Sequence, residues 1–155
     1  MGYNYGAKLN SRVKKTLKSL IAMCLSYGFV AWSLVMALPG PLISVFTPDR
    51  ELQSLTVPLM RIYFLAFFCM SFQNSGQNTF VALNCPRRAV FFSLLRKVVL
   101  VLPFTLLFPI WMGVSGVFWA EALSQLIGGS ACIITMLITV YRKVRSTPDG
   151  VKADI

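Results

Sequence analysis

Four stretches of this sequence contain no charged residue, and each is long enough to cross a lipid bilayer. They run over residues 19–48, 62–86, 98–120 and 122–141. A helix needs about 20 apolar residues to span a hydrocarbon layer of about 30 Å. Only 13% of the 155 residues are charged, whereas a soluble domain has about 25%. The sequence therefore predicts an all-α membrane protein with four transmembrane helices.

Prolines, glycines and charges divide the chain into a short lead-in, the four helices and a tail. We expect a cytoplasmic lead-in with the start of a basic helix at 1–19 and a cytoplasmic tail at 143–155. The helices are predicted at about 20–46, 54–84, 89–111 and 116–142. Pro39 and Pro41 lack backbone donors and should end the first helix. Thr47 or Asp49 could cap the second.

The basic residues predict how the chain is oriented. Thirteen of the 15 lie before the first span, between the second and third, or after the fourth. The positive-inside rule then places both termini in the cytoplasm of a multi-pass protein of the plasma (inner) membrane. The net charge of +10 is accordingly an orientation signal with some attraction to anionic lipid, rather than a nucleic-acid footprint. The set comprises Lys8, Arg12, Lys14, Lys15, Lys18, Arg87, Arg88, Arg96, Lys97, Arg142, Lys143, Arg145 and Lys152. Arg96 and Lys97 are expected at the cytoplasmic headgroup level.

Four amides mark the second span as the helix most directly concerned with function. Gln73, Asn74, Gln77 and Asn78 fall within an arc of roughly 140° on a helix, and the opposite face is apolar. A buried amide without a partner costs several kcal/mol in hydrocarbon, so this side should meet helices, a wet cavity or a ligand. Hydrogen bonding between helices and a functional site both remain open explanations.

Two ionisable residues near the membrane are candidates for ion binding or gating. Arg61 lies about two turns into the second helix, where it either snorkels outward or contacts substrate. Glu121 lies near the external end of the fourth helix, as a favourable N-terminal charge or as a proton or cation site. Ala120, Ser124 and Gly128, with Cys132, form a ladder of small residues that favours close helix packing.

Enzyme chemistry and metal binding have no support in the sequence. The chain has no histidine, and its four cysteines show neither a Cys-x-x-Cys pair nor the spacing of metal ligands. No glycine-rich phosphate loop and no constellation of nucleophile and base is present. We therefore predict neither a catalytic site, nor a metal, nor a bound cofactor.

The order of several motifs resembles the multidrug and toxic compound extrusion (MATE) family. The opening is similar to the cytoplasmic loop in the second half of those transporters, and three later segments are similar to successive helices. These segments are Tyr3-Asn4-Tyr5-Gly6-Ala7-Lys8 with Arg12-Val13, Phe72-Gln73 through Phe80-Val81-Ala82-Leu83, Arg87-Arg88 through Ser93-Leu94-Leu95-Arg96 with Pro103, and Gly113-Val114-Ser115-Gly116-Val117-Phe118-Trp119-Ala120-Glu121.

The resemblance implies a fold of twelve helices in two lobes, of which this chain would supply the last four. It implies export of cationic and amphipathic drugs in exchange for sodium ions or protons, by alternating access. The partners implied are the lipid bilayer, small cationic or amphipathic substrates and the missing N-terminal lobe, without which the chain should not transport. Many members carry a carboxylate in the helix that matches the second span, but this chain has only amides and Arg61 there. The coupling ion is therefore expected in the missing part.

On this reading, polar contacts to substrate come from Gln73, Asn74 and Gln77, and Tyr63 offers a π face to cationic drugs. Asn78 could instead serve packing. Two other functions stay open. A flippase for a lipid-linked precursor shares the general architecture but should have a more basic cavity. A small four-helix assembly protein that transports nothing would fit the small-residue ladder equally well.

Overall fold

The computed structural model describes residues 1–151 and 153, and every regular element within them is a helix. Four helical runs are long and apolar enough to span a membrane: Asn10–Ala37, Arg50–Ala82, Pro86–Met112 and Val114–Ser146. The predicted all-α fold with four spans is therefore confirmed. Lys152 and part of the predicted tail at 143–155 lie outside the described residues.

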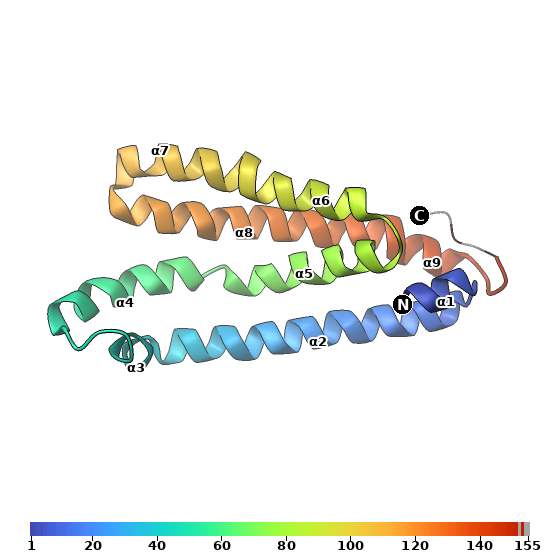
Figure 1. Cartoon of the computed structure of the whole chain (residues 1–155), viewed down its shortest axis with the longest axis horizontal. Helices are drawn as coiled ribbons and strands as arrows, with labels where there is room; N and C mark the ends of the chain where they lie inside the picture. Colours follow the sequence, from blue (N-terminus) through green and yellow to red (C-terminus); the bar gives the residue numbers. More distant parts are fainter. Residues whose placement is uncertain (152, 154–155) are drawn as a thin grey trace.

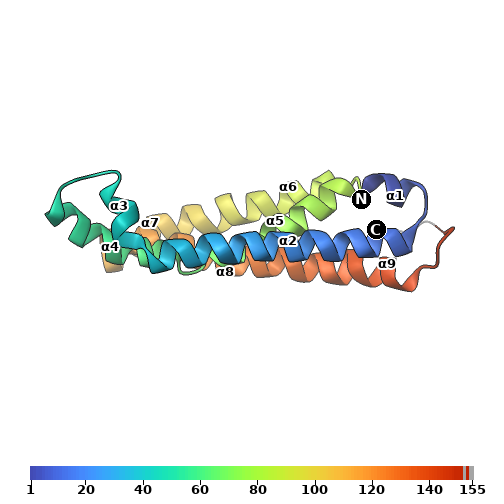
Figure 2. The same cartoon turned by 90° about the horizontal axis from the view of Figure 1, so that it is seen from below.

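The four runs are built from shorter helices that lie side by side (Figures 1 and 2). The first contains α2 (Asn10–Ala37), preceded by α1 (Gly2–Gly6) and followed by the short α3 (Pro39–Ser44). The second consists of α4 (Arg50–Phe64) and α5 (Phe67–Ala82). The third joins α6 (Pro86–Leu94), the π-helical segment η1 (Leu95–Val101) and α7 (Leu102–Met112). The fourth joins α8 (Val114–Met136), the π-helical segment η2 (Leu137–Tyr141) and α9 (Arg142–Ser146).

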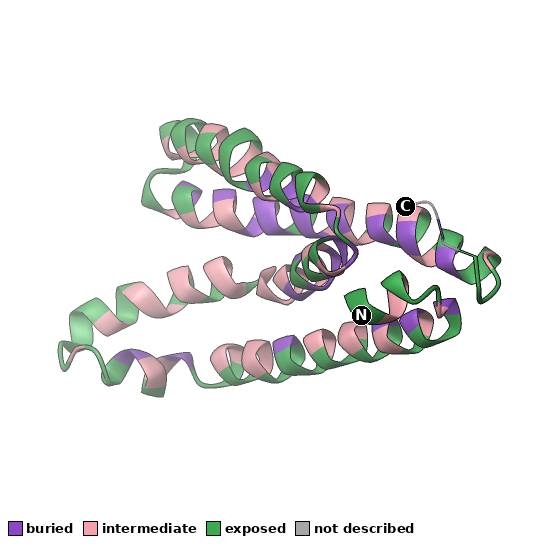
Figure 3. Ribbon diagram, turned by 45° about the vertical axis from the view of Figure 1, so that its right-hand side comes forward, coloured by how far each residue is buried: buried purple, intermediate pink, exposed green. Residues whose placement is uncertain are grey.

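Helix α8 is the centre of the bundle. It packs against α4, α5, η1 and α7, and α2 reaches it mainly through α5. Figure 3 shows the buried residues concentrated along α8 and α5, while α2 is mostly exposed or half-buried. The exposed side of α2 is apolar, as expected of a surface that meets lipid or further helices. The short helices α1 and α9 lie at one end of the bundle, and α3 lies at the other (Figure 1).

The small-residue ladder on α8 serves close packing, as its spacing predicted. Ala120, Ser124 and Cys132 have no exposed surface, and Gly128 is buried. A neighbouring glycine shows how close the helices come, since a side-chain carbon on Gly129 would overlap the backbone of α5. In a membrane such small residues let two backbones approach and gain van der Waals contact.

The ends of the first two spans follow the local signals, but the second span has a break that the pattern did not predict. Helix α2 ends at Ala37, two residues before Pro39, and the carboxylate of Asp49 caps α4 by accepting a hydrogen bond from the backbone amide of Glu51 at 2.9 Å. The expected continuous helix at 54–84 is interrupted at residues 65–66. On one side of the break Tyr63 packs on Phe118 of α8, and on the other Phe68 packs on Phe29 of α2. Both halves pack on α8, and the aromatic contacts differ on the two sides of the break.

A clasp of hydrogen bonds joins the lead-in to the tail. The amide nitrogen of Asn10 donates to the carbonyls of Pro148 and Val151, both at 2.8 Å. Both the backbone and the hydroxyl of Ser11 donate to the carboxylate of Asp149, at 2.8 and 2.6 Å. No pattern in the sequence predicts a contact between these two segments, so the clasp is a finding of the structure. It joins the start of α2 to the segment that follows α9.

The clasp predicts a measurable dependence on pH. The Ser11 hydroxyl and then the Ser11 amide lower the pKa of the exposed Asp149 carboxyl below its usual value of 3.8, because both stabilise the charged form. Tail docking should therefore be fully favoured above about pH 3.8 and weaken as the pH falls through the lowered pKa. A ¹³C NMR titration of the Asp149 carboxyl should give a midpoint below 3.8, and Ser11→Ala should return it toward that value.

The matched control is Ser146→Ala, since the Ser146 hydroxyl bonds only its own helix, at the Lys143 carbonyl. This variant should leave the Asp149 midpoint unchanged. An Asp149 that titrates at its usual value, or that ignores the loss of the Ser11 hydroxyl, would show that the clasp does not hold in solution.

Candidate functional site: a charged pocket between α5, η1 and α8

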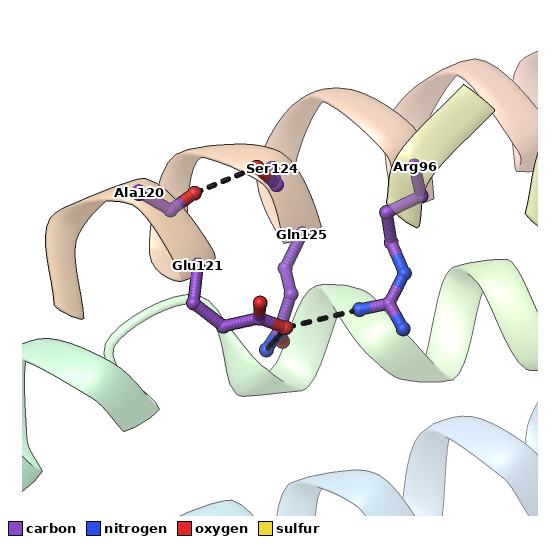
Figure 4. Close-up of polar contacts among 5 residues, drawn as sticks. All are labelled: Arg96, Ala120, Glu121, Ser124 and Gln125. Atoms are coloured by element: carbon purple, nitrogen blue, oxygen red, sulfur yellow. Dashed lines mark hydrogen bonds and ion pairs between the residues drawn. The ribbon is translucent and has the colours of Figure 1, made fainter. Parts of the chain in front are cut away.

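Two side chains from the third and fourth spans form an ion pair inside the bundle. Nη1 of Arg96 lies 3.3 Å from Oε1 of Glu121, and the side chains are only 11% and 21% exposed. Gln125, one turn after Glu121 on α8, donates its amide to the same carboxylate oxygen at 3.2 Å. Figure 4 shows Glu121 and Gln125 projecting from α8 toward Arg96 of the facing helix. The cluster is well ordered by these contacts but leaves several polar atoms unused.

The local structure of both helices brings the pair together. Arg96 lies in the π-helical segment η1. Such segments are rare in proteins overall, but those that occur are often at functional sites. Its side-chain stem lies over Gly128, where an added Cβ would come within 3.1 to 3.3 Å of three Arg96 carbons. The absence of a side chain at Gly128 thus makes room for the arginine. Ser124 stays out of the cluster because its hydroxyl bonds the Ala120 carbonyl at 2.7 Å (Figure 4).

A pocket of about 530 Å³ opens beside the ion pair, within the range of small-molecule sites. Charged and polar groups line one part of it and apolar or aromatic groups the other. The lining residues are Tyr63, Phe67, Met70, Arg96, Lys97, Val101, Glu121 and Gln125. Such a surface suits an amphipathic organic molecule with an aromatic body.

A second pocket, of about 260 Å³, lies between α2 and α5. It shares Phe67 and Met70 with the charged pocket and contains Asn74 and Tyr27. The two pockets therefore adjoin the same turn of α5, and a ligand or a shift of that turn could link them.

The structure divides the predicted amide stripe into two pairs. Gln73 is 4% exposed, and its backbone carbonyl accepts a weak bond from the Cys132 thiol of α8 at 3.7 Å. Gln77 donates to the Ala89 carbonyl of α6 at 3.4 Å. Asn74 and Asn78 are exposed on the other flank. Gln73 and Gln77 thus lie within the helix packing in this arrangement, and Asn74 is the amide that lines a pocket.

The other predicted residues are placed as follows. Tyr63 lines the charged pocket, and so does Glu121, whose partner was not anticipated. Arg61 is exposed in the last turn of α4, and the described part of the chain shows no ion pair for it.

The main residue that sequence reasoning missed is Arg96. The expectation that Arg96 marks the headgroup level is wrong for its side chain, which turns inward and is 9% exposed. A signal was available, because Arg96 is ten residues after the proline that starts its helix. This is about 15 Å along the axis and too deep for a simple surface charge.

These features define a polytopic membrane protein with a small-molecule pocket among its spans. The MatE family model matches residues 1–107, which is more than half of the chain. The chain belongs to this family and is a MATE-family transporter sequence, as the resemblance of its motifs indicated. Its class is thus that of a multi-pass membrane transporter. No curated protein and no solved structure matches the chain.

Proposed function

We propose that this chain forms the last four helices of a MATE-type multidrug exporter, which exchanges amphipathic substrates, cationic ones included, for sodium ions or protons. Family membership supports the transporter class. The observation that carries the proposal further is the pocket beside Arg96 and Glu121, which combines charge with the aromatic rings of Tyr63 and Phe67. Charged side chains within membrane spans are energetically unfavourable, so a site of this composition is expected to have a function.

Several further features of the exporter belong to the same proposal. Both termini would face the cytoplasm, which agrees with four spans and with the basic residues beside them. Tyr63 and Asn74 would contact substrate from adjacent pockets. Gln73 and Gln77 would become available only when α5 moves relative to α8 and α6, as alternating access requires. The Glu121 carboxylate already holds a guanidinium, so the coupling ion would bind in the first eight helices, and this chain alone would not transport.

The test replaces the last four helices of an active MATE exporter by this chain and measures efflux of a cationic dye from cells. The hybrid should export the dye, whereas the chain expressed alone should not. Tyr63→Ala and Asn74→Ala should each lower efflux by about threefold to tenfold, because each removes one substrate contact of about 1 kcal/mol. Trp111→Ala is the matched control, since this ring is 89% exposed and outside both pockets. Efflux by the chain alone, or a membrane-inserted hybrid without dye export, would overturn the proposal.

A further inference from the structure

The charged pocket carries more positive than negative charge. Arg96 and Lys97 both line it, and Glu121 is its one acidic residue among those described. An organic cation entering this pocket would meet a guanidinium that already holds the carboxylate, together with a free ammonium group. Like charges raise each other's energy strongly in a medium of low dielectric constant. The surplus positive charge therefore favours a ligand with a negative group.

Hydrogen bonds left unmade at the ion pair support the same ligand chemistry. Glu121 occupies only the Nη1 end of the Arg96 guanidinium, and the buried Nε has no acceptor among the described residues. A guanidinium presents five N–H donors in a planar fork and can bind a carboxylate through two parallel bonds. Gln125, which is 2% exposed, has its amide oxygen buried without a donor. A buried donor without an acceptor is costly, so a ligand carboxylate that accepts hydrogen bonds from Arg96 would remove a penalty.

The arrangement gives each charged residue a distinct task. Glu121 keeps Arg96 paired when the pocket is empty, because an unpaired guanidinium inside the bundle would be strongly unfavourable. Lys97 follows Arg96 in the π-helical segment and is exposed, so it is free to meet a negative group at the pocket mouth. Tyr63 and Phe67 supply aromatic surface for the rest of the ligand.

We propose that this pocket binds the carboxylate of an amphipathic aromatic molecule, held by Arg96 and Lys97, with Glu121 as the resident counter-ion of the arginine. The inference rests on the proposed exporter function and specifies which charged group of a substrate this lobe receives. A zwitterionic substrate would place its acid here and its amine elsewhere. A purely cationic one would lie away from Arg96 and Lys97, against the Tyr63 ring and beside Asn74 of the adjoining pocket.

The test compares three probes that share one ring system: pyrenebutyrate, its methyl ester and pyrenemethylammonium. Pyrene fluorescence reports their binding to the purified full chain in detergent. The acid should bind about tenfold tighter than the ester, the difference expected from charge-assisted hydrogen bonds, and the cation should bind no tighter than the ester. Equal affinity for acid and ester, or a preference for the cation, would overturn the inference.

Variants separate the roles of the three charges. Lys97→Gln should weaken acid binding severalfold while leaving ester binding unchanged. Lys97 is exposed and takes no part in the Arg96–Glu121 ion pair, so the variant should fold like the unmodified protein. Glu121→Gln keeps an acceptor for Arg96 and should strengthen acid binding, because it removes a competing negative charge. Arg50→Gln is the control, as it removes an exposed positive charge outside the pocket. A Glu121→Gln variant that loses acid binding, or a Lys97→Gln variant that keeps it in full, would contradict the assignment.

Failure of this inference can be told apart from failure of the exporter. Dye efflux from the hybrid with no preference for the acid probe would overturn the carboxylate site and leave the exporter in place. A clear preference for the acid probe in the purified chain, without efflux from the hybrid, would overturn the exporter and leave the binding site.

Discussion

Replacing Gly129 by leucine is expected to abolish the packed bundle, and replacing it by alanine to destabilise it by about 3 kcal/mol. A Cβ at this position would overlap the carbonyl oxygen of Cys69 and lie 3.1 Å from the carbonyl carbon. The obstacle is backbone on α5, which cannot rotate away as a side chain would. The helices must therefore separate, and the contact between α5 and α8 is lost. Thermal unfolding in detergent, followed by circular dichroism, measures the effect.

Gly6→Ala is the matched control for this prediction. A Cβ added at Gly6 meets nothing within 4 Å, and the residue is the last of the short helix α1. Alanine has the higher helix propensity, so this variant should melt at the same temperature or slightly higher. If Gly129→Ala also melted like the unmodified protein, the close approach of α5 and α8 would not exist in the folded state.

The spans were predictable from the sequence because each depends on a local property. A charge-free run of sufficient length has few alternatives to a membrane helix, and Asp49 lies at the start of α4 where a cap is required. The small-residue ladder also has a local periodicity of four, which places its members along one face of a helix. In each case the signal and the structure involve the same few consecutive residues.

The candidate site was harder to predict because it depends on which helices meet. A helical wheel places the four amides of α5 in one arc, but α8 and α6 cover one half of that arc and leave the other open. Gln73 and Asn74 therefore have different surroundings although they are adjacent. The break at residues 65–66 contains neither proline nor glycine, so no local signal marks it, and different aromatic contacts lie on its two sides.

Arg96 shows why the positive-inside rule does not place individual side chains. The number of basic residues in the loops predicts the orientation of the chain, but it does not reveal which basic side chain turns into the bundle. Its partner, Glu121, is 25 positions away in the sequence. No local pattern links the two, and only the packing of η1 on α8 brings them together. Glu121 itself was predicted as an ion or gating candidate, and its observed partner narrows what it can bind.

Removing the carboxylate of Glu121 is expected to cost about 3 kcal/mol of folding stability, the lower end of the range for breaking a buried ion pair. Glu121→Leu leaves the guanidinium of Arg96 inside the bundle without its counter-ion, with its side chain only 11% exposed. The amide of Gln125 loses its acceptor at the same time. Thermal unfolding of the purified variant in detergent should show a marked decrease in melting temperature.

The double variant Arg96→Leu with Glu121→Leu tests whether the loss of stability comes from leaving one charge buried without its partner. Replacing both charges by apolar groups removes the cost of desolvating them, so the double variant should be about as stable as the unmodified protein. It should also lose the preference for a carboxylate probe, because the guanidinium that binds the carboxylate is absent. Folding stability would thus be kept while binding specificity is lost. Two single variants whose effects simply add in the double variant would show that Arg96 and Glu121 do not interact in the folded protein.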